Sequence, residues 1–289
     1  MNYFLSLLVF FEIYVIVALS LNLLIGYSGL LQIAHAAYYG VGAYVGSLLM
    51  LKLGLGFIPA IVLAGAASAI LSLLVSLPAW RFRGDYFVMI SLAVQVTLYS
   101  VMYNWVELTN GPYGLTGIPN PAISSSIFAT PYSITVFYGF IVAILAGILG
   151  ILKLSPFGRS LQALRDDELA ARSLGLPVRK LKVESFLIAS AMVGIAGCMY
   201  ASYVRYIDPS SFTLNESILM LSMVIVGGTG NIRGPLLGAA VLIALPELLR
   251  FLTLPDSIAA NVRLLAYGLL LIVMMHVRPQ GLAGKYRFE

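Results

Sequence analysis

Residues 132–152 read YSITVFYGFIVAILAGILGIL, an apolar run without a charged side chain. A helix needs about 20 mostly apolar residues to cross a bilayer core about 30 Å thick, so this run is long enough to be a membrane span. Its apolar character is continuous and does not alternate from residue to residue. That pattern indicates a spanning helix and excludes a strand of a membrane β-barrel.

Apolar runs of the same kind recur on both sides of this segment. They lie near 3–25, 30–51, 57–79, 86–104, 183–203, 214–231, 235–253 and 259–277. Together with 132–152 they predict an all-α, polytopic transmembrane helix bundle of about nine spans, in a range of about 8–10, within one domain over residues 1–289. The glycine-rich end of 214–235 is compatible with a re-entrant segment, and 26–32 with a break inside a longer helix.

The composition excludes an ordinary soluble domain. Hydrophobic residues make up 60% of the 289 positions and charged residues 10%, whereas soluble domains carry about 25% charged residues. The net charge of +5 comes from basic residues in short loops between apolar runs. Topology explains these residues better than binding to nucleic acid, so no nucleic-acid partner is expected.

The distribution of basic residues predicts the orientation in the membrane, because Lys and Arg favour the cytoplasmic side. Nine spans with an external N-terminus place on the outer side only Lys52, Arg205, Arg250 and Arg263. The C-terminus is therefore predicted to be cytoplasmic. Residues 153–182 then form the longest inner loop, and residues 105–131 form a long outer, periplasmic loop.

The inner loop predicts a short amphipathic helix over 156–174. Ser155 and Pro156 suit a helix start, and Gly175 before Pro177 suits a helix end. Glu168 and Arg172 form an i,i+4 pair in the favourable order. The residues near one apolar stripe are Leu161, Leu164, Ala171 and Leu174. Two interpretations stay open: the stripe lies on lipid headgroups or on its own bundle, or it docks into a groove of a cytoplasmic partner.

Residues 155–175 read SPFGRSLQALRDDELAARSLG and closely resemble the coupling loop of LivM-type permeases, the membrane subunits of branched-chain amino acid ABC importers. The loop also resembles the general importer motif E-A-A-x-x-x-G, although its acid, Glu168, stands one place early. The resemblance implies contact with an ATPase through Arg159, Arg165, Asp166, Asp167, Glu168, Ala170, Ala171 and Gly175.

The resemblance extends over nearly the whole chain. Its further signatures are LNLLIGYSGL at 21–30, RFRGDY at 81–86, TNGPYGLTGIP at 109–119, GGTG at 227–230 and RPQGL at 278–282. The glycines at 227–230 have neither the following Lys-Ser/Thr nor the preceding strand of a phosphate loop. The chain is therefore expected to be no enzyme and to bind no cofactor itself, with ATP held by separate ATPase subunits.

The resemblance implies a multi-pass permease of the bacterial cytoplasmic (inner) membrane that imports leucine, isoleucine, valine or related amino acids. Its implied partners are a second, LivH-type permease, two ABC ATPase subunits, a periplasmic substrate-binding protein and membrane lipid. A urea, amide or other amino-acid ABC permease is the nearest alternative. An ion-coupled secondary transporter or channel is the alternative of another class.

Polar residues near the N-terminus suggest a second site. Gln32 and His35 are polar at membrane depth, where such groups line a pathway or form interhelical hydrogen bonds. A metal site is not expected, because the other histidine, His276, is far along the chain. Gly42 and Gly46, four residues apart, favour close helix packing.

In the outer loop, glycine and proline mark turns. The loop is either a simple connector or, as the resemblance implies, a contact for the binding protein through Gly111, Pro112, Gly114 and Gly117.

Overall fold

The computed structural model describes residues 2–82, 84–121, 131–250, 256–278 and 280–284. In chain order its elements are α1 (Asn2–Asn22), the π-helical turn η1 (Leu23–Tyr27), α2 (His35–Leu53), α3 (Phe57–Ser76), η2 (Pro78–Trp80), α4 (Asp85–Asn104), α5 (Val106–Thr109), η3 (Gly111–Tyr113), β1 (Leu115–Thr116), α6 (Pro131–Leu154), α7 (Pro156–Asp166), α8 (Glu168–Ser173), α9 (Val178–Val204), β2 (Tyr206–Ile207), η4 (Pro209–Phe212), α10 (Leu214–Gly227), α11 (Arg233–Arg250) and α12 (Asp256–Val277).

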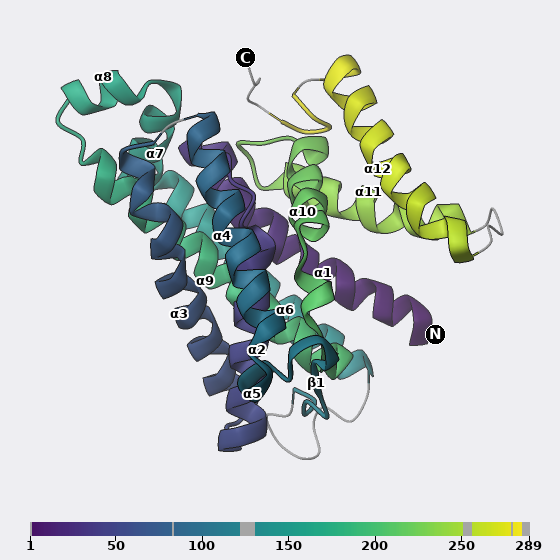
Figure 1. Ribbon diagram of the computed structural model, residues 1–289. Coiled ribbons are helices and arrows are strands. Elements are labelled where there is room, and N and C mark those ends of the chain that lie inside the picture. Colours follow the sequence, from purple (N-terminus) through teal and green to yellow (C-terminus); the bar gives the residue numbers. More distant parts are fainter. Residues whose placement is uncertain (1, 83, 122–130, 251–255, 279, 285–289) are drawn as a thin grey trace.

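The long helices run between two ends of a bundle (Figure 1). One end carries α7 and α8, and the other carries α5 and β1. Helices α2, α3 and α9 pack closely on one another through small residues. A Cβ atom on Gly42 would collide with the backbone of Gly194, and one on Gly197 would collide with the carbonyl of Tyr39. Close backbone approach of this kind is how helices associate where lipid supplies no hydrophobic drive, so the close packing predicted at Gly42 is confirmed.

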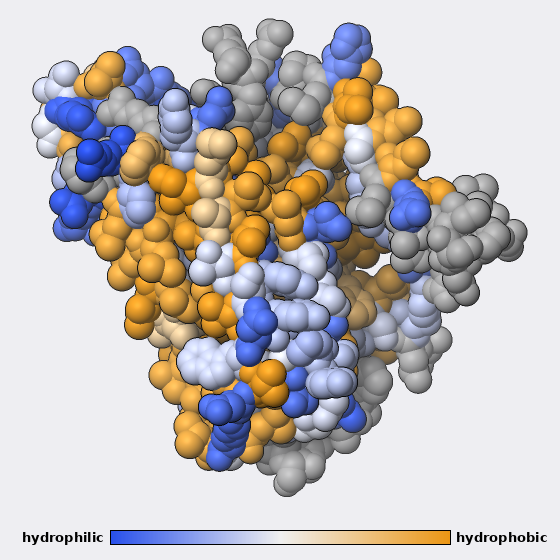
Figure 2. All heavy atoms as spheres, viewed as in Figure 1, coloured by the Kyte–Doolittle hydropathy of each residue, from blue (hydrophilic) through white to orange (hydrophobic). Residues whose placement is uncertain are grey.

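The predicted all-α, polytopic bundle is confirmed. Among the described residues, five helices are long and apolar enough to cross a membrane, namely Tyr3–Tyr27, Phe57–Ser76, Asp85–Asn104, Tyr132–Leu154 and Val178–Val204. Large apolar side chains cover their flanks, including Ile70 at 65% exposure and Ile151 at 73%. Figure 2 shows this hydrophobic surface beside hydrophilic residues gathered around α8. The chain is thus a multi-pass membrane protein.

The prediction that a span begins at residue 30 is wrong, because α2 starts only at His35. The preceding helix ends in the π-helical turn η1, and Leu30 donates its amide to the Leu24 carbonyl at 2.9 Å. Gly29 then takes a left-handed conformation with φ of 69°, which suits glycine. The break predicted within 26–32 is therefore confirmed, and it displaces the start of the second helix.

Helix α10 is too short to cross the bilayer core by itself. Its 14 residues rise about 21 Å at 1.5 Å per residue, against a core of about 30 Å. The helix also begins beside the buried start of α2, where Ser217 accepts the amide of Ala36 at 3.0 Å. These two observations fit the re-entrant geometry considered for this stretch.

The loop over residues 105–131 contributes one strand of a small β-sheet that the sequence did not predict. β1 pairs antiparallel with β2, with Leu115 opposite Ile207 and Thr116 opposite Tyr206. Two residues per strand are too few to form a sheet layer, so the pairing acts as a tie between the outer loop and the end of α9.

Candidate coupling surface

We call residues 155–177 the coupling segment; it comprises α7, α8 and the turn into α9. Its predicted start is confirmed. Ser155 accepts the amide of Gly158 at 3.2 Å, and Pro156 occupies the first turn, where its missing N–H is harmless. A Cβ atom on Gly158 would collide with the Leu152 carbonyl. Glycine therefore lets α7 fold back sharply against the end of α6.

The prediction of one continuous helix over 156–174 is wrong, because the segment breaks at Asp167. This residue has extended backbone angles, with φ of −156° and ψ of 109°. Its carboxylate accepts the amides of Leu169 at 2.8 Å and Ala170 at 3.0 Å. Aspartate competes for nearby backbone donors and is a preferred N-cap, so it ends α7 and starts α8.

The apolar stripe of the coupling segment divides between two surroundings. Leu161, Leu164 and Ala171 are buried against the bundle, at 0%, 3% and 2% exposure. Leu174, predicted to share their stripe, is 79% exposed, and Leu169 is 63% exposed. The segment therefore packs on its own bundle through one face and presents two leucines outward from α8.

Glu168 ties α8 to the base of the bundle. One of its carboxylate oxygens lies 2.9 Å from the ammonium of Lys182, and the other lies 3.2 Å from the guanidinium of Arg172. The Lys182 side chain is only 2% exposed and also donates to the Ala79 carbonyl at 3.0 Å. Because a buried ammonium needs both a counter-charge and acceptors, Lys182 joins α8, α9 and η2 at one point through Glu168 and Ala79.

Arg165 ties α7 to η1, the turn that follows α1. Its guanidinium donates to the Gly26 carbonyl at 2.7 Å and pairs with Asp166 at 2.8 Å. The Arg165 side chain is 14% exposed, whereas that of Asp166 is 59% exposed. We call the contacts of Glu168 and Arg165 the clasp, since they hold the coupling segment to the bundle at two points.

The remaining predicted residues of the segment lie at its surface and at its end. Arg159 is exposed and donates to the Leu154 carbonyl at 2.9 Å, and Ala170 is exposed on α8. Gly175 has φ of 81°, and the amide of Leu176 reaches the Ala171 carbonyl at 3.1 Å. This is the glycine-capped helix end that the sequence predicted.

A second cluster of close contacts joins two signatures that are far apart in sequence. We call it the glycine junction: residues 227–234 together with 280–284. The amides of Leu282 and Ala283 each donate at 2.9 Å, to the carbonyls of Val226 and Gly227 respectively. A Cβ atom on Gly227 would collide with the carbonyl of Gly234. The C-terminal segment is thus held backbone to backbone on the α10–α11 turn.

The glycine junction also contacts the end of α1. The side-chain oxygen of Asn22 accepts the Gly230 amide at 3.1 Å, and its nitrogen donates to the Asn231 carbonyl at 2.9 Å. A Cβ atom on Gly26 would lie 2.6 Å from the Gly230 nitrogen. Gly26 therefore sits between the junction and Arg165, so the coupling segment and the α10–α11 turn both meet η1.

Gln32 and His35 are both 1% exposed and bonded to each other. The imidazole Nδ1 lies 2.9 Å from the Gln32 side-chain nitrogen, and Nε2 lies 2.8 Å from the Ser20 hydroxyl. That hydroxyl donates to the Val17 carbonyl at 2.8 Å. The pattern fits a neutral imidazole with its hydrogen on Nε2.

The same region satisfies the free amides at the start of α2. Ala37 donates to the Gln95 side chain at 2.8 Å, while Gln95 donates to the Phe212 carbonyl at 2.9 Å. Such end groups have no intrahelical partner and need other acceptors in the absence of water. The polar atoms of Gln32 and His35 are thus engaged within the chain, and a role in lining a pathway stays a prediction.

The four residues predicted to contact a binding protein divide by exposure. Gly111 and Gly114 are buried, and both have positive φ, at 56° and 69°; they shape the turn. Pro112 and Gly117 are exposed beside Tyr113, whose exposure is 79%. Residues 122–130 of the predicted loop lie outside the described residues. Tyr113 was not singled out from the sequence and is the largest exposed group at this turn.

Comparison with known proteins decides the family. Residues 3–275 match the model for the permease component of branched-chain amino acid transport systems. The chain belongs to this family. It is 34% identical to the high-affinity branched-chain amino acid transport system permease protein LivM of Salmonella typhimurium, over 93% of this chain and 67% of that protein.

Two further relatives extend the similarity. The probable branched-chain amino acid transport permease protein LivM of Methanocaldococcus jannaschii is 27% identical, over 96% of this chain and 92% of that protein. The LivH permease of Salmonella typhimurium is 24% identical over the same shares of the two chains. These relatives are transport permeases and not enzymes, and this chain is a permease of the same class.

Sequence reasoning missed two residues on which the permease's contacts depend. Lys182 was counted only as a basic residue of the inner loop, yet it is the buried partner of Glu168. Asn22 was quoted only as part of a signature, yet its side chain bonds the backbone of two adjacent residues of the glycine junction, Gly230 and Asn231. A polar residue inside an apolar run is the signal that points to Asn22, whereas no spacing rule joins Lys182 to Glu168.

Proposed function

We propose that this permease is the membrane subunit of an ATP-driven importer, and that separate ATPase subunits bind the coupling segment from the cytoplasm. The observation that carries the proposal is the geometry of α8. It presents Leu169 and Leu174 outward, while Glu168 ties its inner side to Lys182. Covering exposed apolar side chains with a partner lowers the free energy of the complex. Because α8 is tied to the bundle, a displacement of α8 is transmitted to α9 and η2.

The substrates we propose are leucine, isoleucine and valine, delivered by a soluble binding protein at the outer loop. A second permease of the LivH type completes the pathway. The proposal of a second permease is supported by the alignment of both LivM and LivH proteins with nearly the whole of this chain, because two kinds of subunit that align in this way share one architecture. The complex resides in the bacterial inner membrane with the C-terminus of this chain in the cytoplasm, as the basic loops favour.

The test of coupling replaces both outward leucines, Leu169→Gln with Leu174→Gln. The matched control is Leu53→Gln, because Leu53 is also an exposed leucine, at 67%, but lies at the end of α2. Proteoliposomes hold the permease with its ATPase and LivH-type subunits and receive binding protein outside. The double variant is expected to insert normally, to lose ATPase co-purification and to lose ATP-dependent leucine uptake. Wild-type uptake by the double variant would refute the coupling assignment.

The same proteoliposomes separate the alternatives. Uptake that persists without ATP and collapses when an ion gradient is dissipated would identify a secondary transporter. Uptake of radiolabelled leucine that excess valine suppresses and excess urea does not is the result expected for a branched-chain amino acid importer. The reverse order of competition would assign the permease to urea or amide transport.

A further inference from the structure

A groove of about 760 Å³ opens at the base of α9. Its lining residues are Leu77, Arg172, Leu176, Pro177, Val178, Arg179, Lys180, Val183 and Glu184. The walls come from three regions that the fold brings together: the end of α3, α8 with the turn that follows it, and the first turns of α9. A volume of this size lies in the range of sites for small molecules, about 300–1,000 Å³.

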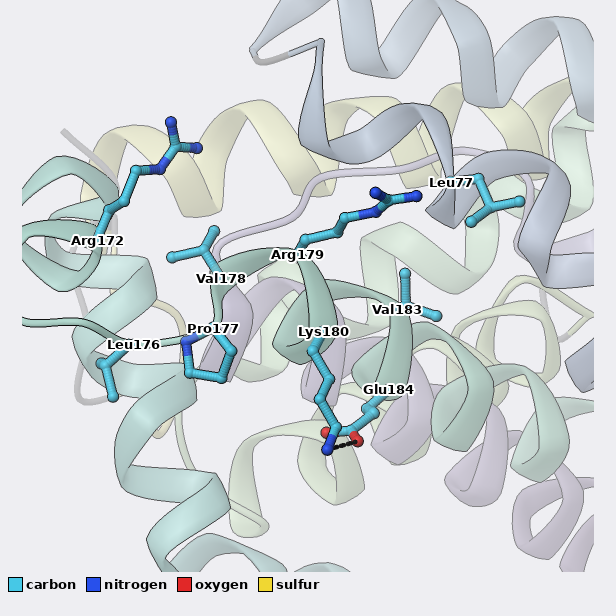
Figure 3. A pocket seen from close by; sticks show the side chains of 9 residues that line it. All are labelled: Leu77, Arg172, Leu176, Pro177, Val178, Arg179, Lys180, Val183 and Glu184. Atoms are coloured by element: carbon cyan, nitrogen blue, oxygen red, sulfur yellow. Dashed lines mark ion pairs between the residues drawn. The ribbon is translucent and has the colours of Figure 1, made fainter.

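The charge of the groove favours an anion. Its lining holds three cations, Arg172, Arg179 and Lys180, against one carboxylate, Glu184. Figure 3 shows the guanidinium groups of Arg172 and Arg179 on the same side, while Lys180 turns away toward Glu184. That Lys180–Glu184 pair spans 3.7 Å and is largely exposed, so it is weak. The groove also lies at the N-terminal end of α9, whose dipole favours negative charge.

The apolar side of the groove continues into the membrane-facing surface of α3. Leu77 is 45% exposed, and Leu74 and Ile70 on the same face are 52% and 65% exposed. Positions 70, 74 and 77 follow the i, i+4, i+7 spacing of a single helix face. An apolar track therefore leads from the two guanidiniums along a membrane-spanning helix.

We propose that this groove binds an anionic phospholipid, with the phosphodiester on Arg172 and Arg179 and an acyl chain along Leu77, Leu74 and Ile70. Basic pockets beside transmembrane helices at the cytoplasmic side suit acidic lipid headgroups. An acidic protein surface would match the positive charge of the two arginines but would leave the track on α3 unused, because that track faces the bilayer. The combination of charge and track therefore favours a lipid over a protein.

The proposal connects the lipid to the clasp. Arg172 belongs to the groove and also pairs with Glu168 at 3.2 Å. A phosphodiester on Arg172 would compete with Glu168 for the guanidinium, and would leave Glu168 to Lys182 at 2.9 Å. The lipid would thus act on the same carboxylate that holds α8 to the bundle.

The experiment is native mass spectrometry of the full chain in detergent, titrated with phosphatidylglycerol or with phosphatidylcholine of the same acyl chains. The variant is Arg172→Gln with Arg179→Gln. The matched control is Arg233→Gln, an exposed arginine at the start of α11, outside the groove. Each basic side chain near an anionic headgroup strengthens binding by roughly fivefold, so the double variant is expected to bind phosphatidylglycerol about twentyfold more weakly, with the control unchanged.

Four outcomes would overturn the proposal. Equal retention of phosphatidylcholine would show an apolar groove without a headgroup site. Undiminished preference for phosphatidylglycerol in the double variant would place the lipid elsewhere. Displacement of the lipid by millimolar inorganic phosphate would show a site for free anions. Loss of ATPase subunits from the double variant, without any lipid preference in the wild type, would assign the groove to the ATPase interface.

Two further measurements keep the test decisive. Arg179→Gln alone changes an exposed side chain and is expected to weaken phosphatidylglycerol binding about fivefold, so the test survives if the double variant does not fold. None of the readouts requires transport, so failure of the lipid site and failure of the proposed importer function are separate results.

Discussion

The clasp and the glycine junction meet at η1, and each is held together by different means. At the clasp, long side chains make the contacts: Arg165 reaches the Gly26 carbonyl at 2.7 Å, and Lys182 reaches Glu168 at 2.9 Å. At the junction, backbone lies directly on backbone, because glycines such as Gly227 leave no room for a Cβ atom. Side-chain contacts can change by rotation about single bonds, whereas packed backbones have few alternative arrangements.

This difference suggests a division of labour within the permease. The junction is the rigid reference that fixes α1, α10, α11 and the C-terminal segment to one another. The clasp is the more adjustable connection, and its side chains join the coupling segment to η1 and α9. Substitutions at the junction should therefore reduce the stability of the fold most. Substitutions at the clasp should reduce coupling to ATP hydrolysis, with a smaller loss of stability.

The largest expected effect is at the junction. Gly227→Val places a side chain against the Gly234 carbonyl, and overpacking against backbone is expected to destabilise the permease by about 3 kcal/mol or more. Thermal unfolding in detergent measures the loss. The control is Gly147→Ala on α6, where no atom outside the backbone of its own helix lies within 4 Å of the new Cβ. Because alanine favours a helix interior more than glycine does, this control is expected to raise the free energy of unfolding by up to about 1 kcal/mol. Equal stability of the two variants would contradict the tight backbone packing inferred for the glycine junction.

The next effect is at the buried ion pair of the clasp. Glu168→Gln leaves the Lys182 ammonium, 2% exposed, without its counter-charge, and breaking a buried pair costs about 3 kcal/mol. Asp166→Asn is the control, since that carboxylate is 59% exposed and its ion pair contributes under about 1 kcal/mol. Adding Lys182→Met to Glu168→Gln should restore stability but not ATP-dependent uptake. Full recovery of uptake would show that the pair serves packing alone.

A smaller effect is expected where α7 meets α1. Arg165→Gln loses the charge-assisted bond to the Gly26 carbonyl, a loss of about 1.5–3 kcal/mol. Arg159→Gln also loses a bond to a carbonyl, that of Leu154, but on an exposed surface, where about 0.5 kcal/mol is expected. The ratio of ATPase activity with and without binding protein should fall for Arg165→Gln more than for Arg159→Gln. If the two variants had equal activity ratios, the Arg165 contact with Gly26 would have no role in coupling.

The smallest effect is at the break between α7 and α8. Asp167→Ala removes the cap on the amides of Leu169 and Ala170, which is expected to cost about 1 kcal/mol. Asp167→Asn retains a capping oxygen and serves as the control. Hydrogen exchange of those two amides should accelerate in the alanine variant alone. Unchanged exchange would mean that the coupling segment tolerates a continuous helix.

Features that depend on neighbouring residues could be predicted from the sequence. The apolar runs, the start at Ser155 and the end at Gly175 depend on chemistry within one or two helical turns. The break at Asp167 is also local, and it was missed because Asp167 was considered only for the ATPase contact that the resemblance implies. An aspartate followed by free amides is itself a capping signal.

The amino-acid sequence was sufficient to predict a membrane-spanning helical bundle with a capped, amphipathic loop at 153–182, because lipid allows a long apolar run few other structures. Only the tertiary structure decided that Glu168 meets Lys182, that residues 280–284 lie on Gly227, and that Gly26 joins both clusters. Those contacts bring together residues from separate helices, and their partners are selected by the packing of the whole bundle, which no local pattern specifies.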